Sequence, residues 1–369
     1  MQEILYYVGT MLISMICGFI AIPLIIKFCL KKNLYDFPNS RKLHHNPTPR
    51  LGGISFVPVM LLVFVFVLFL IDSGSNREIH ISLWSVYFCI ALFVIYFTGF
   101  VDDLIGLNAT TKFVIETLAI ILIPASNLYI NNLYGLFGIY TIPYSAGAPL
   151  TVLVLVFCCN AINLIDGIDG LSGSLSFIAL TGYLICFHIE HLTFYCVMIA
   201  ALAGVLISYL YFNIFGSVAK QHKIFMGDSG SLSLGFILGF LAVKLSMNTP
   251  RMPYNPNRMV LAWTLLALPC LDVVRVFFFR ILQGRSPFSP DKKHIHHKLI
   301  ACGLSQHQAL VCLIALQLLF IATNVILTDM VDPTITLLVD ISMYAVFNTV
   351  INLATSHRKA DAGNPQQTA

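Results

Sequence analysis

Hydrophobic residues run in long stretches along this chain, and short polar segments separate them. A membrane-spanning helix needs about 20 mostly apolar residues. Eleven stretches meet that requirement, of which the fourth and sixth are the shortest. We therefore predict eleven transmembrane helices over the approximate ranges 4–30, 54–71, 83–101, 113–128, 150–165, 175–187, 192–212, 232–247, 259–282, 310–327 and 336–353.

The composition supports an all-α polytopic membrane protein. Hydrophobic residues make up 58% of the chain and charged residues only 10%, and the mean hydropathy is +0.84. A soluble domain needs far more charge to cover its surface. The net charge of +4 is spread along the chain and gives no argument for nucleic-acid binding. We expect ten reduced cysteines, because they lie in apolar runs without a C-x-x-C pair.

The loops between the stretches predict the domain organisation and the orientation. No loop is long enough to form a separate domain, so we predict one transmembrane catalytic domain over residues 1–356 and a short polar tail over 357–369, which we expect to be disordered. Four of the 21 Lys and Arg residues fall on one side of the predicted membrane, and the other 17 fall on the opposite side. Basic loops face the cytoplasm, so the N-terminus should lie outside and the C-terminus inside. We also expect the first span to be retained, since no basic segment or cleavage site precedes it.

Acidic residues collect on the predicted cytoplasmic side. Asp102 and Asp103 end the third span, Asp166 and Asp169 follow the fifth, and Asp228 precedes the eighth. Each could be an ordinary solvated loop acid if taken alone. Carboxylates close to a bilayer are costly, however, and their convergence from three loops favours a functional site.

A repeat of polar residues ends the fifth span. Asn160, Asn163, Asp166 and Asp169 recur every three residues, a spacing that places side chains along one helix face. The negative end of the helix dipole favours a cation there, and hard oxygen ligands suit Mg²⁺, with Mn²⁺ as an alternative. The competing interpretation is a polar seam that packs against a neighbouring helix.

Three further segments carry candidate binding residues. Residues 225–231 combine Phe225 with two glycines at the start of a predicted helix, where free N–H groups can bind phosphate, although an ordinary helix cap looks the same. His294, His296 and His297 lie among Lys and Arg, which favours a diphosphate or sugar ligand over zinc. The basic segment 41–53 holds His44, His45 and Arg50, stiffened by prolines.

Other polar residues in the predicted spans suggest no chemistry. We interpret Asp272 and Arg275 as an i, i+3 ion pair, and we assign no role to Glu116 or Asp340. Lys112 could extend its charge to the interface, or it could face a lipid phosphate beside the two acids of the third span.

Taken in order, these motifs resemble the polyprenyl-phosphate N-acetylhexosamine-1-phosphate transferase superfamily, the WecA/MraY type of glycosyltransferase family 4. The resemblance covers about three quarters of the chain. Its motifs are Arg41-Lys-Leu-His44…Pro49-Arg50-Leu-Gly52-Gly53, Asp102-Asp103 with Lys112, Asn160-x-x-Asn163-x-x-Asp166-Gly-x-Asp169-Gly170, Phe225-Met-Gly-Asp228 and His294-x-His296-His297.

The resemblance implies roles for individual residues. As catalytic residues it implies Asp102, Asp103 and Asp228, with the first two beside the acceptor phosphate. As metal ligands for Mg²⁺ it implies Asp228, Asn163 and Asp166. As substrate-binding residues it implies His44, Arg50, Lys112, Asp169, Gly170, Phe225, His294, His296 and His297.

The implied reaction moves N-acetylhexosamine 1-phosphate from a UDP-sugar to undecaprenyl phosphate and releases UMP, the first step of a cell-surface polysaccharide. The run Ser286-Pro-Phe-Ser-Pro-Asp-Lys is similar to the branch that uses UDP-N-acetylglucosamine. We therefore expect a multi-pass enzyme of the plasma (inner) membrane with its site on the cytoplasmic face, with or without a homodimer.

Four alternatives stay open at this point. The UDP-MurNAc-pentapeptide branch belongs to the same superfamily, but it differs before Gly52-Gly53. A secondary transporter would have a similar number of spans, with acids near the midplane. A CDP-alcohol phosphatidyltransferase would carry a different Asp signature, and a sugar-only glycosyltransferase would release UDP.

Overall fold

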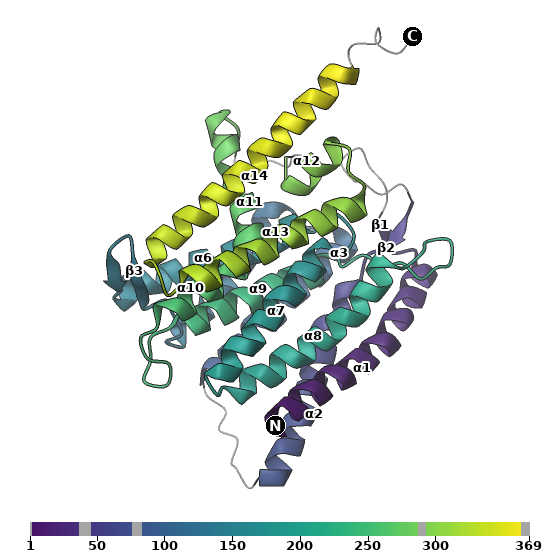
Figure 1. Cartoon of the computed structure of the whole chain (residues 1–369). Helices are drawn as coiled ribbons and strands as arrows, with labels where there is room; N and C mark the ends of the chain where they lie inside the picture. The colour runs from purple at the N-terminus through teal and green to yellow at the C-terminus, as the bar shows by residue number, and fades with distance from the viewer. Residues whose placement is uncertain (1, 37–45, 76–82, 287–292, 363–369) are drawn as a thin grey trace.

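The computed structural model describes residues 2–36, 46–75, 83–286 and 293–362. Helices dominate these residues (Figure 1). They are α1 (Gln2–Lys32), α2 (Phe56–Ser75), α3 (Leu83–Ile105), α4 (Ala109–Ile120), α5 (Leu122–Ala125), α6 (Tyr144–Ile165), α7 (Leu171–Ile189), α8 (Thr193–Ile214), α9 (Asp228–Ser246), α10 (Pro256–Thr264), α11 (Ala267–Leu282), α12 (Ile295–Ala301), α13 (Gln306–Leu327) and α14 (Pro333–Ala362), with a 3₁₀ turn η1 (Gly52–Ser55).

Nine helices of the described residues are long and apolar enough to cross a membrane: α1, α2 (with η1), α3, α6, α7, α8, α9, α13 and α14. The all-α polytopic class is therefore confirmed. The predicted sixth span is longer than expected, because α7 covers Leu171–Ile189. All ten cysteines are free, as predicted.

The predicted fourth and ninth spans are each broken into two helices. The fourth divides into α4 and α5, and the ninth into α10 and α11. A proline ring clashes with the carbonyl four residues earlier and cannot donate a hydrogen bond to it. Pro124 stands four residues after Ile120, where α4 ends, and Pro269 stands four residues after Leu265, just beyond α10. Continuous apolar composition thus conceals two helix breaks.

Helix α9 lies at the centre of the bundle. It packs against α3 and α6, and nearly every one of its residues is buried. Two of its buried serines satisfy their hydroxyl groups inside the helix, since Ser233 donates to the Ser229 carbonyl at 2.7 Å and Ser246 to the Ala242 carbonyl at 2.8 Å. Because α9 starts at Asp228, the central position of the helix also places this carboxylate where other elements surround it.

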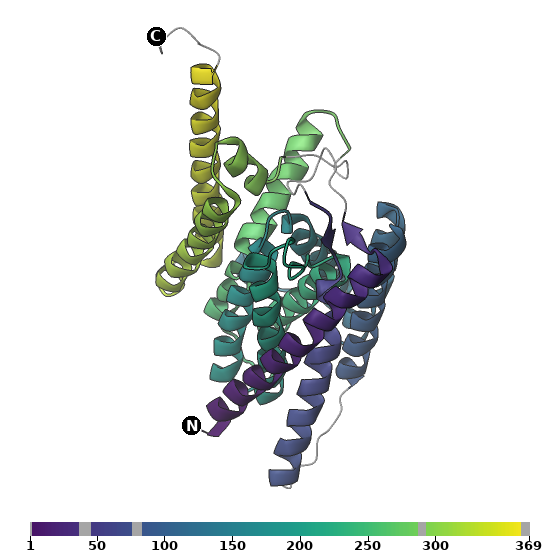
Figure 2. The same ribbon diagram turned by 90° about the vertical axis from the view of Figure 1, so that its right-hand side faces the viewer.

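Helices α13 and α14 form an outer layer, on the opposite flank from α1 and α2 in Figure 2. Polar side chains of α13 join this layer to the break between α10 and α11. Gln317 donates to the Thr264 carbonyl at 2.9 Å and accepts from the Leu268 N–H at 3.2 Å. Asn324 donates to the Thr264 hydroxyl and to Asp340 of α14. The two Gln317 bonds satisfy backbone groups that the helix break leaves without a partner, and the Asn324 bonds tie side chains of the two layers together.

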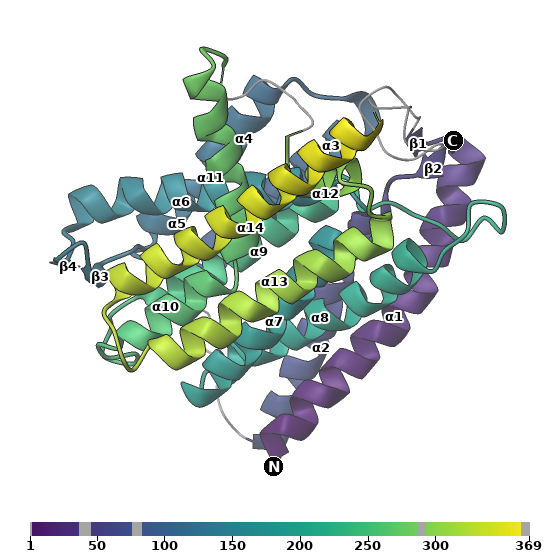
Figure 3. The same cartoon turned by 45° about the horizontal axis from the view of Figure 1, so that its top comes forward.

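Two small antiparallel sheets complete the described fold, and Figure 3 shows them on different sides of the bundle. Strands β1 (Tyr35–Asp36) and β2 (Thr48–Pro49) pair beside the end of α1, and β3 (Asn132–Leu136) pairs with β4 (Ile139–Thr141) before α6. The first sheet brings the chain that follows β2 to the start of α9.

Candidate active site

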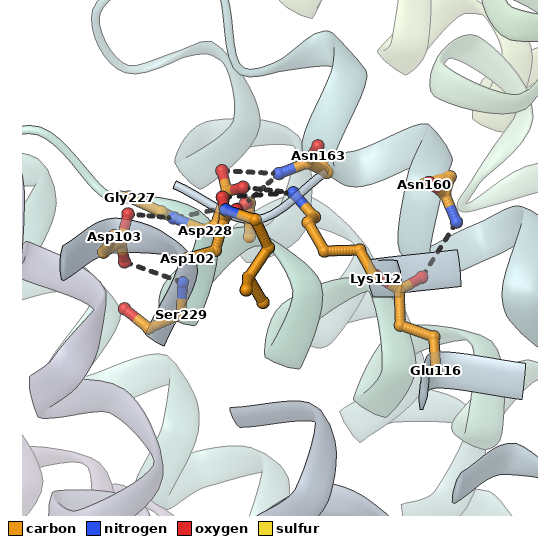
Figure 4. A network of polar contacts seen from close by, with 11 residues as sticks. Asp102, Asp103, Lys112, Glu116, Asn160, Asn163, Gly227, Asp228 and Ser229 are labelled. Carbon is orange, nitrogen blue, oxygen red and sulfur yellow. Dashed lines mark hydrogen bonds and ion pairs between the residues drawn. The ribbon is translucent and has the colours of Figure 1, made fainter. Parts of the chain in front are cut away.

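Three helix ends meet at one place in the bundle (Figure 4). Asp102 and Asp103 lie in the last turn of α3, Asn163 lies near the end of α6, and Asp228 begins α9. Lys112 reaches the same place from α4. The predicted convergence of distant polar residues is therefore present in the structure.

Asp103 joins the end of α3 to the start of α9. Its carboxylate accepts the Asp228 N–H at 2.8 Å and the Ser229 N–H at 3.0 Å, and its residue is only 4% exposed. These N–H groups belong to the first turn of a helix and have no partner within it. Because each Asp103 oxygen accepts one of them, this carboxylate fixes where Asp228 stands.

The Asp228 carboxylate, unlike that of Asp103, is held by side chains and not by backbone N–H groups. Its carboxylate accepts from the Lys112 ammonium and from the Asn163 amide, the latter at 3.0 Å. The same ammonium lies 3.3 Å from Asp102, so one cation stands between two carboxylates. Asn163 also donates to Ser231 at 2.8 Å. The arrangement shows that this position attracts positive charge.

The polar repeat of α6 does not follow one helix face. The helix ends at Ile165, so Asp166 is its C-cap and Asp169 lies beyond the helix. The prediction of a single face is therefore wrong for these two acids, because the chain leaves the helical path at Asp166-Gly167. Asn160 points elsewhere and donates to the buried Glu116 at 3.0 Å.

A cavity of about 640 Å³ opens at these helix ends. The predicted site residues that line it are Arg50, Asp102, Asp103, Asn163, Asp166, Asp169, Phe225, Asp228 and His297. Burial and the nearby carboxylates of Asp228, Asp169 and Asp103 raise the pKa of Asp166 to about 7. The cavity thus combines acidic, basic and aromatic groups in one volume.

The basic segment after β2 forms one wall. Phe225 donates its N–H to the Pro49 carbonyl at 2.7 Å, and the Gly53 N–H donates to the Met226 carbonyl at 2.7 Å. A Cβ atom on Gly53 would lie 2.2 Å from the Cα atom of Gly230, so no other residue fits this approach. These bonds hold Arg50 at the cavity. The predicted residue His44 lies outside the described residues.

Two residues for which the sequence predicts no role, Lys223 and Asn213, support the cavity wall around Asp169. Lys223 contacts Asp169 at 2.6 Å and the Asn213 carbonyl at 3.0 Å, and both Lys223 and Asn213 line the cavity. The Asn213 side chain accepts the Gly170 N–H at 2.6 Å, so Gly170 lies behind the wall rather than on it. The only sequence signal was a lysine three residues before the Met-Gly-Asp motif.

The histidine motif reaches the cavity through one of its three members. His297 lines the cavity, whereas His294 and His296 are buried and do not. A Cβ atom on Gly167 would lie 2.1 Å from Nε2 of His296, so the absence of a side chain lets α12 approach the acidic loop. Burial lowers the pKa of His296 to about 3, which keeps this imidazole neutral.

The interpretation of Asp272 and Arg275 as a simple pair is incomplete. The pair exists, with 2.7 Å between the Arg275 guanidinium and Asp272. Asp272 also accepts from His294 Nδ1 at 2.8 Å, which links α11 to the histidine motif.

The residues present fit a magnesium ion. Within the described ranges, no three His, Cys, Asp or Glu side chains are grouped closely enough to hold a metal by themselves. Mg²⁺ does not need such a group, because it uses one or two carboxylates together with water and substrate phosphates. Asp228 and Asp166 line the cavity as carboxylates, and Asn163 can turn its amide oxygen toward it. The Lys112 ammonium between two carboxylates marks the favourable position for a cation.

Comparison with known proteins adds an independent line of support. The sequence profile described as glycosyl transferase family 4 matches residues 83–246, from the start of α3 to the end of α9. The undecaprenyl-phosphate α-N-acetylglucosaminyl 1-phosphate transferase of Escherichia coli K12 is 30% identical over 287 residues, which is 77% of this chain and 74% of the relative. The protein of the same name from Yersinia pestis is equally similar over 288 residues.

A probable undecaprenyl-phosphate N-acetylglucosaminyl 1-phosphate transferase of Bacillus subtilis is 29% identical over 339 residues, 88% of this chain and 86% of the relative. The similarity covers the elements that bring Asp103, Asn163 and Asp228 together. The chain therefore belongs to glycosyl transferase family 4, within the polyprenyl-phosphate N-acetylhexosamine-1-phosphate transferase superfamily, and it is a phosphosugar transferase.

Proposed function

We propose that this enzyme transfers N-acetylglucosamine 1-phosphate from UDP-N-acetylglucosamine to undecaprenyl phosphate, releases UMP and requires Mg²⁺. The observation that carries the proposal is the cavity at the ends of α3, α6 and α9, where Asp102, Asn163 and Asp228 meet beside basic and aromatic residues. The names of the relatives indicate the acceptor and the sugar. The reaction would initiate a cell-surface polysaccharide.

We place the site on the cytoplasmic face of the plasma membrane, in a bundle that crosses the bilayer eleven times. Helices α3 and α6 both end at the cavity, and α6 starts about 33 Å away, at 1.5 Å per residue over 22 residues. Residues 106–143, with α4 and α5, must therefore return across the bundle. Likewise, α9 starts at the cavity and runs away from it, whereas His297, later in the chain, lies at the cavity again. Helices α10 and α11, which lie between them in the chain, therefore supply a further crossing.

The charge at the cavity end supports the orientation. Arg50, Lys112, Lys223 and His297 all lie at or beside the cavity. Lys and Arg are concentrated in cytoplasmic loops of membrane proteins. A cytoplasmic cavity would also receive a soluble nucleotide sugar directly.

The reaction is a single displacement at phosphorus. An oxygen of the acceptor phosphate forms a new bond to the sugar-linked phosphorus, and the bond from this phosphorus to the bridging oxygen breaks, so that UMP leaves with both electrons of the broken bond. A phosphate monoester has a second pKa of about 6, so the acceptor is mostly a dianion at cytosolic pH and needs no strong base. Lys112 is placed to bind this anion, and Asp102 holds the Lys112 side chain.

The other residues of the cavity receive the donor. Bound Mg²⁺, held by Asp228, Asn163 and Asp166, would supply positive charge to the diphosphate. Phe225 offers an aromatic face to the uracil ring, with Asp169 on the uridine side and Gly170 behind it in the wall. Arg50, His44 and the histidine motif would bind the diphosphate and the N-acetyl sugar, with His297 at the cavity itself.

The proposal is tested with the full chain purified in detergent, undecaprenyl phosphate and a panel of UDP-sugars. We expect UMP release with UDP-N-acetylglucosamine that stops when EDTA removes the metal and resumes with added Mg²⁺. UDP as the product would identify a glycosyltransferase that moves only the sugar. Release with UDP-MurNAc-pentapeptide alone would assign the other branch. No release with any donor, together with solute uptake in proteoliposomes, would support a transporter.

A further inference from the structure

A fully buried carboxylate lies outside the cavity in the middle of α11. Asp272 has no exposed surface and does not line the cavity. Its oxygens accept four hydrogen bonds. The donors are the Arg275 guanidinium at 2.7 Å, the Tyr344 hydroxyl at 2.8 Å, His294 Nδ1 at 2.8 Å and the Ile295 N–H at 3.0 Å.

These donors come from three different elements. Arg275 belongs to α11 itself, Tyr344 belongs to α14, and His294 and Ile295 begin α12. Arg275 also donates to the Lys293 carbonyl. The start of α12 is therefore fastened to α11 through three consecutive residues. Four donors satisfy the hydrogen-bonding capacity of this buried carboxylate. Asp272 therefore holds groups of the protein and does not bind a ligand.

Fastening the start of α12 also sets the place of His297. Helix α12 has only seven residues, and His297 lies three residues after His294, which is one helical turn. The His296 ring between them packs on Gly167. This short series of contacts connects the buried Asp272 to His297, which lines the cavity.

The carboxylate further determines the form of His294. An ionised carboxylate only accepts hydrogen bonds, so the proton of the imidazole must lie on Nδ1, where it faces Asp272 at 2.8 Å. A carboxylate that holds a histidine in this way selects its tautomer and its ring orientation. The His294 and His296 rings are stacked 5.9 Å apart at 6° and therefore share that orientation.

We propose that Asp272 is a positioning residue, which holds His294 and the start of α12 so that the histidine motif meets the donor diphosphate. This role rests on the proposed function. The alternative is a buried ion pair that only stabilises the bundle. The two roles predict different kinetics. Loss of a positioning residue impairs the use of the donor, because the histidine motif binds the donor, whereas general destabilisation affects both substrates equally.

The central test is Asp272→Asn, which keeps the shape of the side chain but presents an amide to His294. We expect kcat/KM for UDP-N-acetylglucosamine to fall about 100-fold, between the losses typical of a supporting carboxylate and of a wrong histidine tautomer. The KM for undecaprenyl phosphate should stay within about twofold of wild type. Tyr344→Phe removes one of the four donors and should give a smaller loss with the same substrate selectivity.

A double-mutant cycle separates positioning from stability. If Asp272 acts through His294, then Asp272→Asn combined with His294→Gln should lose no more activity than His294→Gln alone. Should Asp272→Asn fail to fold, the same cycle is made with Tyr344→Phe. The matched control is Asp340→Asn, another buried acid one turn from Tyr344 on α14, whose side-chain partner is Asn324. It should leave the donor kcat/KM near wild type.

The outcomes distinguish this inference from the proposed function. Additive losses, or equal effects on both substrates with a lower melting temperature, would overturn the positioning role. A wild-type protein that releases no UMP would overturn the proposed function. An active wild type with an unimpaired Asp272→Asn variant would leave the function standing and remove only the role of Asp272.

Discussion

Asp228 and Asp272 both belong to helices of the same bundle, but they differ in burial and in the kind of partners that hold them, since Asp228 is partly exposed and Asp272 is fully buried. Asp228 lies at a helix start and is held by two side chains, Lys112 and Asn163, at the edge of a cavity. Asp272 lies within a helix and is held by four donors away from any opening to the cavity. The comparison teaches that a charged side chain inside a helix bundle is not by itself a reactive carboxylate. Access for a ligand separates the two, because Asp228 lines the cavity and Asp272 does not.

The largest effect is expected at Asp228. The variant Asp228→Asn removes the charge that attracts Lys112 and a metal ion, while it keeps the shape of the side chain. We expect kcat to fall roughly 10³-fold, as when a key electrostatic group is lost, with little change in the melting temperature. UMP release and thermal unfolding in detergent measure the two quantities. Asp329→Asn, at an exposed acid that contacts Asn257, is the control. A kcat within tenfold of wild type would place Asp228 among the supporting residues.

A smaller effect on rate, but a larger one on stability, is expected for Asp103→Ala. Two N–H groups of α9 lose their acceptor, and each buried group without a partner costs about 1–3 kcal/mol. We expect about a 100-fold loss of activity, because Asp228 shifts with the helix start. The melting temperature should fall by several degrees. Asp102→Ala, which loses Lys112 and the Leu107 N–H, should change it less. An inactive Asp103→Ala protein with wild-type stability would assign Asp103 to substrate binding instead.

The smallest effect is expected where the two regions touch. The variant Gly167→Ala places a Cβ atom against the His296 ring, so α12 must move away from the acidic loop. We expect the donor KM to rise roughly tenfold while the acceptor KM stays unchanged, since small displacements weaken the alignment of a bound substrate. The control Gly9→Ala adds a Cβ atom in α1 that meets no atom within 4 Å. Equal changes in both KM values would show that the two regions are not coupled through α12.

The sequence predicts the membrane fold and the convergence of Asp102, Asp103, Asn163 and Asp228, because apolar length and the sidedness of charge are local properties. It does not predict the ends of α4 and α10, where single prolines interrupt apolar runs that are long enough to span a bilayer. The spacing of three between polar residues indicates a helix but does not tell where that helix stops.

Roles that depend on contacts across helices are also missing from the sequence analysis. Nothing in the neighbourhood of Asp272 indicates that Tyr344, 72 residues later, donates to it. Lys223 appears as one more basic loop residue until its contact with Asp169 is seen. Single-sequence patterns identify which residues carry chemistry, and the tertiary structure decides which of them reach the cavity.

The burial of α9 has a consequence for how the chain is inserted into its membrane. The mean hydropathy of α9 is 1.5, against 3.1 for the span that contains α2, so α9 gains less than α2 from contact with lipid tails. In the finished bundle α9 packs most extensively against α3 and α6, both of which precede it in the chain. During synthesis these two neighbours are therefore already in the bilayer when α9 leaves the ribosome, and the order of the segments lets a weakly apolar helix take the central place.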